Sequence, residues 1–399
     1  MSESPYSVII DNSLHSDNFE NNTKGIPMTE WNLRFRTQEE VLGEKVTVSD
    51  TARFTSSSAP ISCFDPARNA IFTPYHASYD GYGEQASVFA LARIALPGLK
   101  ANSSVLLESD VPFYGKKYNW PIDGSAILFD GKIRIFFIAG GDSCYRLDWS
   151  PEEGKTIGGA QEVLCRTGKT SFVRPLTRDA VEAYLKANAC TGYDLRSDAK
   201  ENIIVSAKPA WNGDMFYGTI TSYLSQPILF RCRDGRTFEF CGIVPALAKY
   251  ECQTAVLNGR VYVLLRGASG DEFWEAEEGV WEFRPCGRLS MAETRPQLMS
   301  CGGKLLLAYS RNGMLPNKIR DGRNNITILA GDSGDLSRFE KVFEAVDEMG
   351  IVYYDIVNCN GDLYMIWSNS ERFPDKVVRG VLQGKDTLYC SLLAEKKEK

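Results

Sequence analysis

The sequence predicts an all-β protein and, within that class, a six-bladed β-propeller. Strand-like alternation recurs throughout the chain, whereas helical periodicity is clear only in TRDAVEAYLKANA, residues 177–189. Six segments share one plan: an apolar alternating strand, a tight turn and a second alternating strand. Asn-Gly, Asp-Gly or Gly-Gly lies at the centre of five of them, as two-residue hairpin turns require. The segments are residues 59–78, 125–141, 203–220, 252–267, 296–312 and 353–369.

The spacing of these hairpins favours propeller blades over a β-sandwich. They recur at intervals of about forty to eighty residues, as expected when each marks one small sheet that stacks on its neighbours. A sandwich also has many short strands, but it does not place such similar hairpins this far apart. Six hairpins give six blades, with five or seven as alternatives, and the helix at 177–189 is expected as an insertion on one face. The propeller is expected to span residues 51–390, with residues 1–50 packed on it or completing it and residues 391–399 as a charged tail.

Composition describes a globular protein without a basic surface. The 399 residues are 43% hydrophobic and 24% charged, with a formal net charge of −6, which allows a sizeable core and does not favour nucleic-acid binding. No apolar run approaches the length of a membrane span. The N-terminal MSESPYSVIIDNSLHSDNFENN lacks the cationic and apolar regions of a secretory signal. We therefore expect neither a nucleic acid nor a membrane as a partner.

The cysteines and histidines predict reduced thiols and no metal centre. Eleven cysteines are scattered along the chain without a CxxC pair, which is typical of a protein of the reducing cytoplasm. Two histidines that are far apart complete no ligand cluster, so no cofactor is expected. A calcium ion held by backbone carbonyls would leave no mark in the sequence, and neither would the oligomeric state.

Three segments predict a second repeated element, a turn capped by an acidic residue. They read RCRDGRTFEFCGIV (231–244), GDSGDLSRFEKV (331–342) and, more weakly, SPEEGKTIGG (150–159). In such a turn the acidic side chain caps backbone N–H groups, Gly adopts a positive φ and an aromatic residue packs between sheets. In the second segment the acidic part is the Asp-Ser-Gly at 332–334. We interpret all three turns as scaffold.

These turns resemble the Asp boxes of the sialidase (neuraminidase) superfamily, which normally read Ser-x-Asp-x-Gly-x-Thr-Trp. The stretch 231–238 is a shortened version, and resembling strands extend over residues 58–370. The segment YECQTAVLNGRVYVLLR (250–266) is the best match, because Glu251 opens one strand of a hairpin and Arg266 closes the other. The family has a catalytic Glu and a carboxylate-binding Arg at these two places.

Other family positions follow in the same order. Arg323, in PNKIRDGRNNITILAG, matches an arginine that precedes a strand leading into an Asp box. Tyr353, in IVYYDIVNCNGDLYMIWS, matches the nucleophile, although Tyr354 is the inward residue if the register differs by one. Asp80, in HASYDGYGE, falls near the family's acid. The resemblance therefore implies a sialidase-like β-propeller glycoside hydrolase.

One position departs from the family. The first arginine of the family's triad lies in a Phe-Arg-Ile-Pro motif entering the first blade, where this chain reads TSSSAPIS with Ser58 and Ala59. Arg53 and Arg68 are nearby but out of register, and Arg53 is the candidate substitute for substrate binding. We therefore expect weak or no activity on ordinary sialosides and better activity on small glycosides of another acidic sugar.

The chemistry implied by the resemblance is retaining hydrolysis. Tyr353 would be the nucleophile, because a neutral phenol does not repel the substrate's carboxylate, and Glu251 would take the phenol proton. Asp80 would protonate the leaving group and then activate water. Arg266 and Arg323 would each offer a planar fork to the carboxylate.

Two other classes of function stay open. His76, in TPYHASYDGYGE, is the candidate base of a propeller lyase, in which Arg266 or Arg323 neutralises a uronic acid while its C5 proton is removed. A non-catalytic carbohydrate-binding propeller would instead hold a glycan and leave it chemically unchanged.

Overall fold

The structure is a computed structural model of the chain. It describes residues 32–58, 60–79, 88–167, 172–188, 190, 203, 205, 208–222, 225–267, 270–289, 295–310, 324–369, 371–378 and 381–397. By its internal contacts the chain divides into residues 1–32 and 33–399. Every helix and strand named below belongs to the second part.

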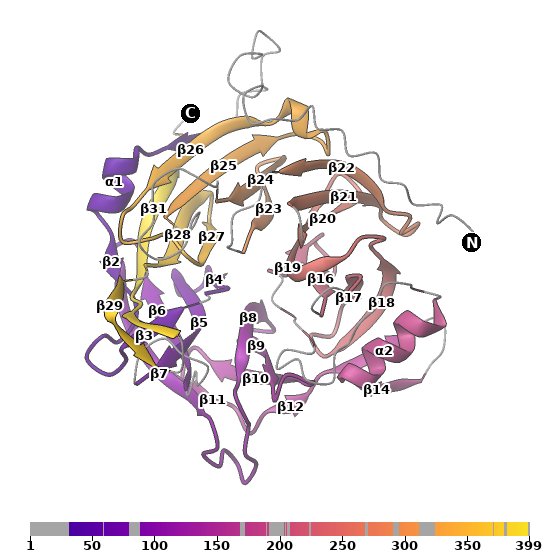
Figure 1. Cartoon of the computed structure of the whole chain (residues 1–399), viewed down its shortest axis with the longest axis horizontal. Coiled ribbons are helices and arrows are strands. Elements are labelled where there is room, and N and C mark those ends of the chain that lie inside the picture. Colours follow the sequence, from indigo (N-terminus) through magenta and orange to yellow (C-terminus); the bar gives the residue numbers. More distant parts are fainter. Residues whose placement is uncertain are drawn as a thin grey trace. The chain divides into compact units, whose positions relative to one another are not determined.

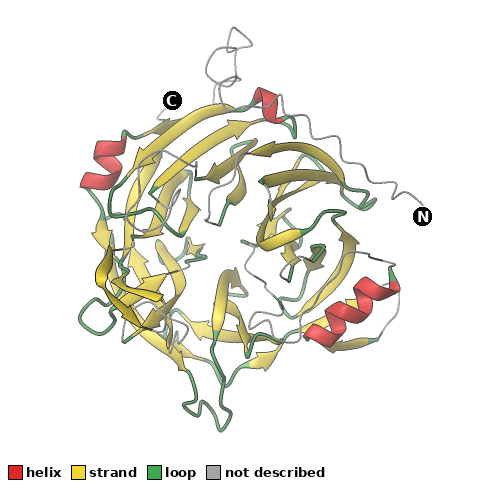
Figure 2. Cartoon of the chain, viewed as in Figure 1, coloured by secondary structure: helices red, strands yellow, loops and turns green. Residues whose placement is uncertain are grey.

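Residues 33–399 form a six-bladed β-propeller, which confirms the predicted fold class (Figure 1). Strands dominate it, and the α-helices lie at the margin of the ring of sheets (Figure 2). The first blade consists of β3 (Ser56–Ser58), β4 (Cys63–Asp65), β5 (Ala70–Ser78), β6 (Val88–Ala95) and β7 (Lys100–Glu108). The second consists of β8 (Ile122–Phe129), β9 (Lys132–Ala139), β10 (Ser143–Ser150), β11 (Lys155–Thr156) and β12 (Gln161–Glu162). The third consists of β13 (Leu164–Thr167), β14 (Val173–Pro175), β15 (Ala210–Trp211), β16 (Phe216–Ile220), β17 (Ile228–Cys232) and β18 (Thr237–Ile243).

The fourth and fifth blades have four strands each, and the sixth has five. The fourth consists of β19 (Ala248–Leu257), β20 (Arg260–Gly267), β21 (Asp271–Glu277) and β22 (Arg284–Leu289). The fifth consists of β23 (Gln297–Cys301), β24 (Lys304–Tyr309), β25 (Asn325–Gly331) and β26 (Glu340–Val346). The sixth consists of β27 (Tyr354–Cys359), β28 (Asp362–Ser368), β31 (Leu388–Lys396), β1 (Leu33–Phe35) and β2 (Val46–Thr47). A separate hairpin, β29 (Glu371–Val378) and β30 (Val381–Lys385), precedes β31.

The six predicted hairpins are strand pairs at one edge of the six sheets. They are β4–β5, β8–β9, β15–β16, β19–β20, β23–β24 and β27–β28, all antiparallel. Their turns have the backbone that the sequence requires, since Asn258 and Gly259 have φ of 52° and 72°. Two consecutive residues of positive φ match the right-handed twist of the strands that they join.

Strands from both ends of the described chain complete the sixth blade. β1 and β2 each pair antiparallel with β31, so the segment 1–50 contributes two strands to this sheet. β31 continues to Lys396, through much of the segment 391–399 that the sequence analysis assigns to a tail. Between β1 and β2 lies α1 (Gln38–Gly43), which begins with a capping box of Thr37 and Glu40.

The predicted helix is α2 (Arg178–Ala187), and Thr177 caps its N-terminus by accepting a hydrogen bond from the Ala180 N–H at 3.3 Å. Val181 and Leu185 are buried in the core cluster shared by the second and third blades. The helix lies between β14 and β15 in the chain, as an insertion that leaves the order of the inner strands unchanged.

The acidic turn within 231–244 joins β17 to β18, and the one within 331–342 joins β25 to β26. The Asp234 carboxylate accepts from the backbone N–H groups of Arg236 (2.8 Å) and Thr237 (2.6 Å), and Phe238 stacks on Phe230 with ring centroids 3.9 Å apart. In the second turn the predicted acidic residue is wrong. Asp335, not the Asp-Ser-Gly at 332–334, accepts from the Ser337 N–H and hydroxyl, because the short 3-10 helix η2 (Leu336–Arg338) begins there.

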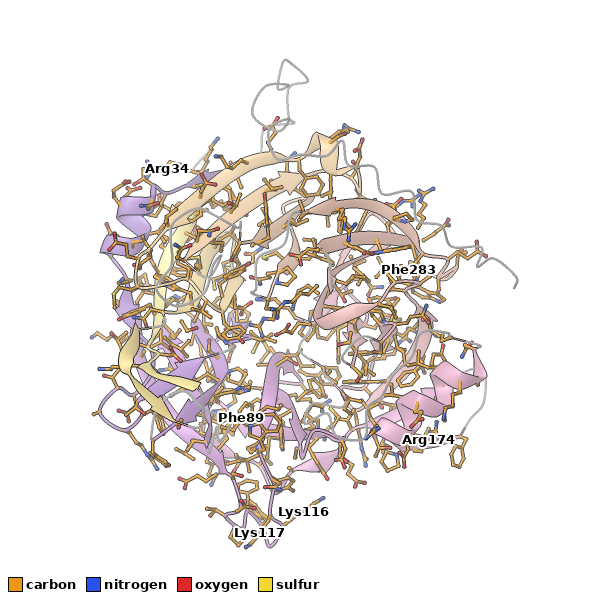
Figure 3. The ribbon with its side chains drawn as sticks, viewed as in Figure 1. Arg34, Phe89, Lys116, Lys117, Arg174 and Phe283 are labelled. Carbon is orange, nitrogen blue, oxygen red and sulfur yellow. The ribbon has the colours of Figure 1, made fainter. Side chains whose placement is uncertain are left out.

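A buried polar layer joins the blades at the centre of the ring, where side chains fill the space between the ribbons (Figure 3). One carboxylate oxygen of Asp355 accepts from Lys208 Nζ (2.8 Å) and Gln297 Nε2 (2.7 Å), and the other accepts from the Ser62 N–H (2.6 Å). The Lys208 N–H in turn donates to Gln253 at 3.1 Å. These residues come from the first, third, fourth, fifth and sixth blades.

We expect Asp355→Ala to lower the free energy of unfolding by about 3–5 kcal/mol, because Lys208 would lose its counter-charge at a buried site. Urea unfolding followed by tryptophan fluorescence measures this change. The matched control is Glu153→Ala, which removes the exposed ion pair with Lys155 (2.9 Å). It should cost less than about 1 kcal/mol. Equal effects of the two substitutions would contradict the central role of Asp355.

Candidate active site

A second group of polar residues lies near the first strands of the fourth, fifth and sixth blades. Glu251 lies on β19, whereas Arg295 lies two residues before β23 begins and Tyr353 one residue before β27 begins. Arg295 lies beside the Tyr353 ring, and its charge acts on Glu251. Glu251, Arg295 and Tyr353 are therefore close to one another in space.

Glu251 and Arg266 form a buried ion pair across the first hairpin of the fourth blade. Arg266 Nη1 lies 3.0 Å from Glu251 Oε2, and the two side chains are only 6% and 13% exposed, respectively. Burial alone raises the pKa of Glu251, but the charges of Arg266 and Arg295 outweigh it and hold this pKa below its ordinary value. Glu251 is therefore ionised at neutral pH.

Arg295 is a central residue that the sequence analysis missed. It is only 3% exposed, and its Nη2 donates to the Pro60 carbonyl at 2.6 Å. Its guanidinium carbon lies 5.8 Å from the centroid of the Tyr353 ring. An Arg-Pro pair before a strand belongs to no motif. Its position could have identified it as a site residue, because Arg295 comes just before a predicted hairpin, as Glu251 and Tyr353 stand at the beginning of theirs.

The two adjacent tyrosines lie in different surroundings. Tyr353 is partly exposed, contacts Arg295 and interacts electrostatically with Arg266. Tyr354 is 1% exposed, and burial raises the pKa of its hydroxyl. That hydroxyl is near the Ser310 hydroxyl, at a geometry short of a hydrogen bond. Of the two, Tyr353 is the one that lies beside Arg295.

Asp271 on β21 adds a second carboxyl group beside Arg266. It is the register partner of Arg266 and is 2% exposed. Burial raises the pKa of Asp271 to about 8, with Arg266 opposing the rise and Glu251 adding to it. Asp271 is therefore protonated at neutral pH, and the charge of Arg266 is balanced by Glu251.

His76 on β5 is close enough to Arg295 to respond to its charge. Burial, followed by the positive charge of Arg295, lowers the pKa of His76 to about 4. The imidazole ring lies 6.3 Å from that of Phe89, centroid to centroid. At neutral pH His76 is thus uncharged and a weak base.

Arg53, the candidate substitute for the first arginine, makes its contacts within the first blade. Arg53 lies within 3.4 Å of the Tyr79 hydroxyl and of Glu108 on β7, the last strand of the first blade. Arg68, the other nearby arginine, pairs with Asp65 at 2.9 Å. Asp80 and Arg323 lie outside the described residues.

Within the described ranges, no three histidine, cysteine or acidic side chains are grouped so that they could hold a metal ion. All eleven cysteines are free thiols. In the same part of the chain, neither helix has the length and apolar character needed to cross a bilayer.

Solved structures of a sialidase have a similar backbone. No family model and no curated protein matches the sequence. Trypanosoma rangeli sialidase in complex with the inhibitor DANA matches with a TM-score of 0.56 and 12% identity, over 90% of this chain and 58% of that one. The fold is that of a sialidase-like propeller. The same enzyme in complex with 2,3-difluoro-KDN gives 0.54 and 13% identity, and a mutant with trans-sialidase activity gives 0.53 and 12%. This chain spans 57% of each of these two structures, so the likeness concerns the propeller.

The protonated state of Asp271 predicts a pH dependence of stability. Its folded pKa of about 8 is above the unfolded value of about 4, so its contribution to stability is complete below about pH 4 and is lost as the pH rises through about 8. The difference in unfolding free energy between wild type and Asp271→Asn should therefore shift in favour of the variant over this range. Urea unfolding at several pH values measures it, and a pH-independent difference would show that Asp271 is ionised in the folded protein.

Proposed function

We propose that this protein is a sialidase-like glycoside hydrolase that cleaves the glycosidic bond of an acidic sugar with retention. One observation supports the proposal above all. Tyr353 lies beside Arg295, whose charge acts on an ionised Glu251 that is paired with Arg266. A tyrosine, a carboxylate and arginines from neighbouring blades are the groups that a tyrosine nucleophile requires.

In the proposed reaction the Tyr353 oxygen attacks the anomeric carbon while the bond to the leaving-group oxygen breaks. Glu251 takes the phenol proton, which its ionised state allows. Asp80 is the proposed acid that protonates the leaving group and later activates water to release the sugar from Tyr353. The positive charges near Tyr353 stabilise the negative charge that develops on its oxygen.

The proposed substrate is a small glycoside of an acidic sugar other than sialic acid. The structurally similar sialidase was solved in complex with sialic acid and with a KDN derivative. This chain has Ser58 and Ala59 where the family has its first arginine, which is the reason to expect a different acid. Eleven free thiols support a cytoplasmic setting, which we include in the proposal.

A lyase centred on His76 is less favoured, because an imidazole with a pKa of about 4 is a weak base for removing a C5 proton. The product distinguishes the two reactions. β-Elimination leaves a 4,5-unsaturated uronate that absorbs in the ultraviolet, whereas hydrolysis does not.

We expect Tyr353→Phe to lower kcat by about 100-fold or more, because it removes the covalent nucleophile. Tyr354→Phe is the matched control, since the Tyr354 hydroxyl is buried and makes no hydrogen bond. It should change activity little. Release of nitrophenol from an accepted glycoside measures both variants. If Tyr353→Phe kept full activity and Tyr354→Phe lost it, Tyr354 would be the residue that faces the site. If neither substitution changed activity, the mechanism would be rejected.

A panel of nitrophenyl glycosides tests the substrate. We expect faster hydrolysis of a Kdo or uronic acid glycoside than of a sialoside, because the arginine set departs from that of the family at Ser58 and Ala59. Neutral hexosides serve as the reference for the contribution of the acidic group. Efficient turnover of a simple sialoside would contradict this expectation.

A further inference from the structure

Arg295 differs from every other buried arginine in the described ranges. Arg134 and Arg146 each lie within 4 Å of the Asp148 carboxylate, at 3.6 Å and 3.3 Å, and Arg266 lies 3.0 Å from Glu251. Arg295 is the least exposed of the four, at 3%, yet among the described residues it has no carboxylate within the same distance. Its hydrogen-bond partner is a neutral carbonyl, that of Pro60.

A buried cation without a paired counter-charge is unfavourable, and proteins retain such a group where an anion binds. Arg295 is near enough to Glu251 to lower the pKa of that carboxyl, but the ion pair of Glu251 is with Arg266. The Pro60 carbonyl takes one of its five N–H donors, and the face of the Tyr353 ring lies beside it. His76 adds no charge, because its pKa of about 4 keeps it neutral.

Arg295 also lies beside the segment of the first blade that lacks the family's first arginine. Pro60 belongs to the TSSSAPIS segment, immediately after Ser58 and Ala59, which stand where the family has its first arginine. Arg295 reaches this segment from the fifth blade and bonds to its backbone. A guanidinium is thus supplied beside the first blade by a residue that is distant in the sequence.

We propose that Arg295, rather than Arg266, is the residue that binds the carboxylate of the substrate and selects an acidic sugar. The inference rests on the proposed function and adds the residue that sets specificity. Arg266 is committed to Glu251, and Asp271 occupies its other side. Arg295 offers the planar fork that suits a carboxylate, and an anion there would lie next to Tyr353.

Calorimetric binding to free sugar acids tests the proposal without requiring turnover. The probes are N-acetylneuraminate, Kdo and glucuronate, each compared with its own methyl ester. Wild type should bind at least one acid more tightly than its ester. In Arg295→Met this preference should fall by about 30-fold or more, as when one partner of a buried charge pair is removed. Arg284→Met is the control, because Arg284 pairs with Glu275 at the outer strand of the fourth blade. It should bind as wild type does.

The unfolding midpoint of Arg295→Met in urea should equal or exceed that of wild type, because the substitution removes an uncompensated charge. Arg295→Lys keeps the charge but not the fork, so it should retain part of the preference even if Arg295→Met does not fold. An acid preference that survives in Arg295→Met, or in Arg295→Lys at its full value, would overturn the proposal, as would a wild type that favours no acid. Loss of the preference in a protein that hydrolyses no glycoside would support the binding role of Arg295 and reject the hydrolase.

Discussion

The arrangement of the blades depends on the hydrogen bonds of the Asp355 carboxylate, which is 2% exposed at the centre of the ring. A carboxylate at such a depth is stable only when its oxygens are satisfied, and here Lys208, Gln297 and the Ser62 backbone satisfy them. Each bond fixes the height of one inner strand relative to the sixth blade. Because Arg295 and Tyr353 lie only two residues before Gln297 and Asp355 in the chain, the same bonds hold these two groups of the candidate site near the centre.

The two arginines of this site are close together and yet have different electrostatic situations. Arg266 lies between two carboxyl groups, of which Glu251 is ionised and Asp271 is protonated, so the cluster of the fourth blade is close to neutral. Arg295 contributes a positive charge that acts on Glu251 but, among the described residues, has no carboxylate at ion-pair distance. A guanidinium beside Tyr353 suits both a developing phenolate and an anionic ligand.

The sequence was informative where local chemistry determines structure. The alternation of apolar residues and the Asn-Gly type of turn locate the inner hairpins. Glu251 and Tyr353, which stand at the beginning of two of these hairpins, mark the end of the blades where the candidate site lies. The sequence was uninformative where burial between blades that are distant in the chain determines the position or the protonation of a residue. Arg295 has no local motif, and the protonation of Asp271 follows from its depth. The sequence analysis ended the propeller before the last residues of β31 because Glu395 and Lys396 are charged, although they pair with Arg34 and Leu33 of β1 in the sixth blade.

The pairing of β1 with β31 has a consequence for synthesis of the protein. A ribosome adding about 5–20 residues per second produces β1 tens of seconds before its partner. During that interval the apolar faces of the first and fifth blades have no sixth blade between them, and the nascent chain is vulnerable to aggregation. A stop codon that removed β31 alone would leave most of the strands intact in sequence but deprive the ring of the strand that joins its two ends.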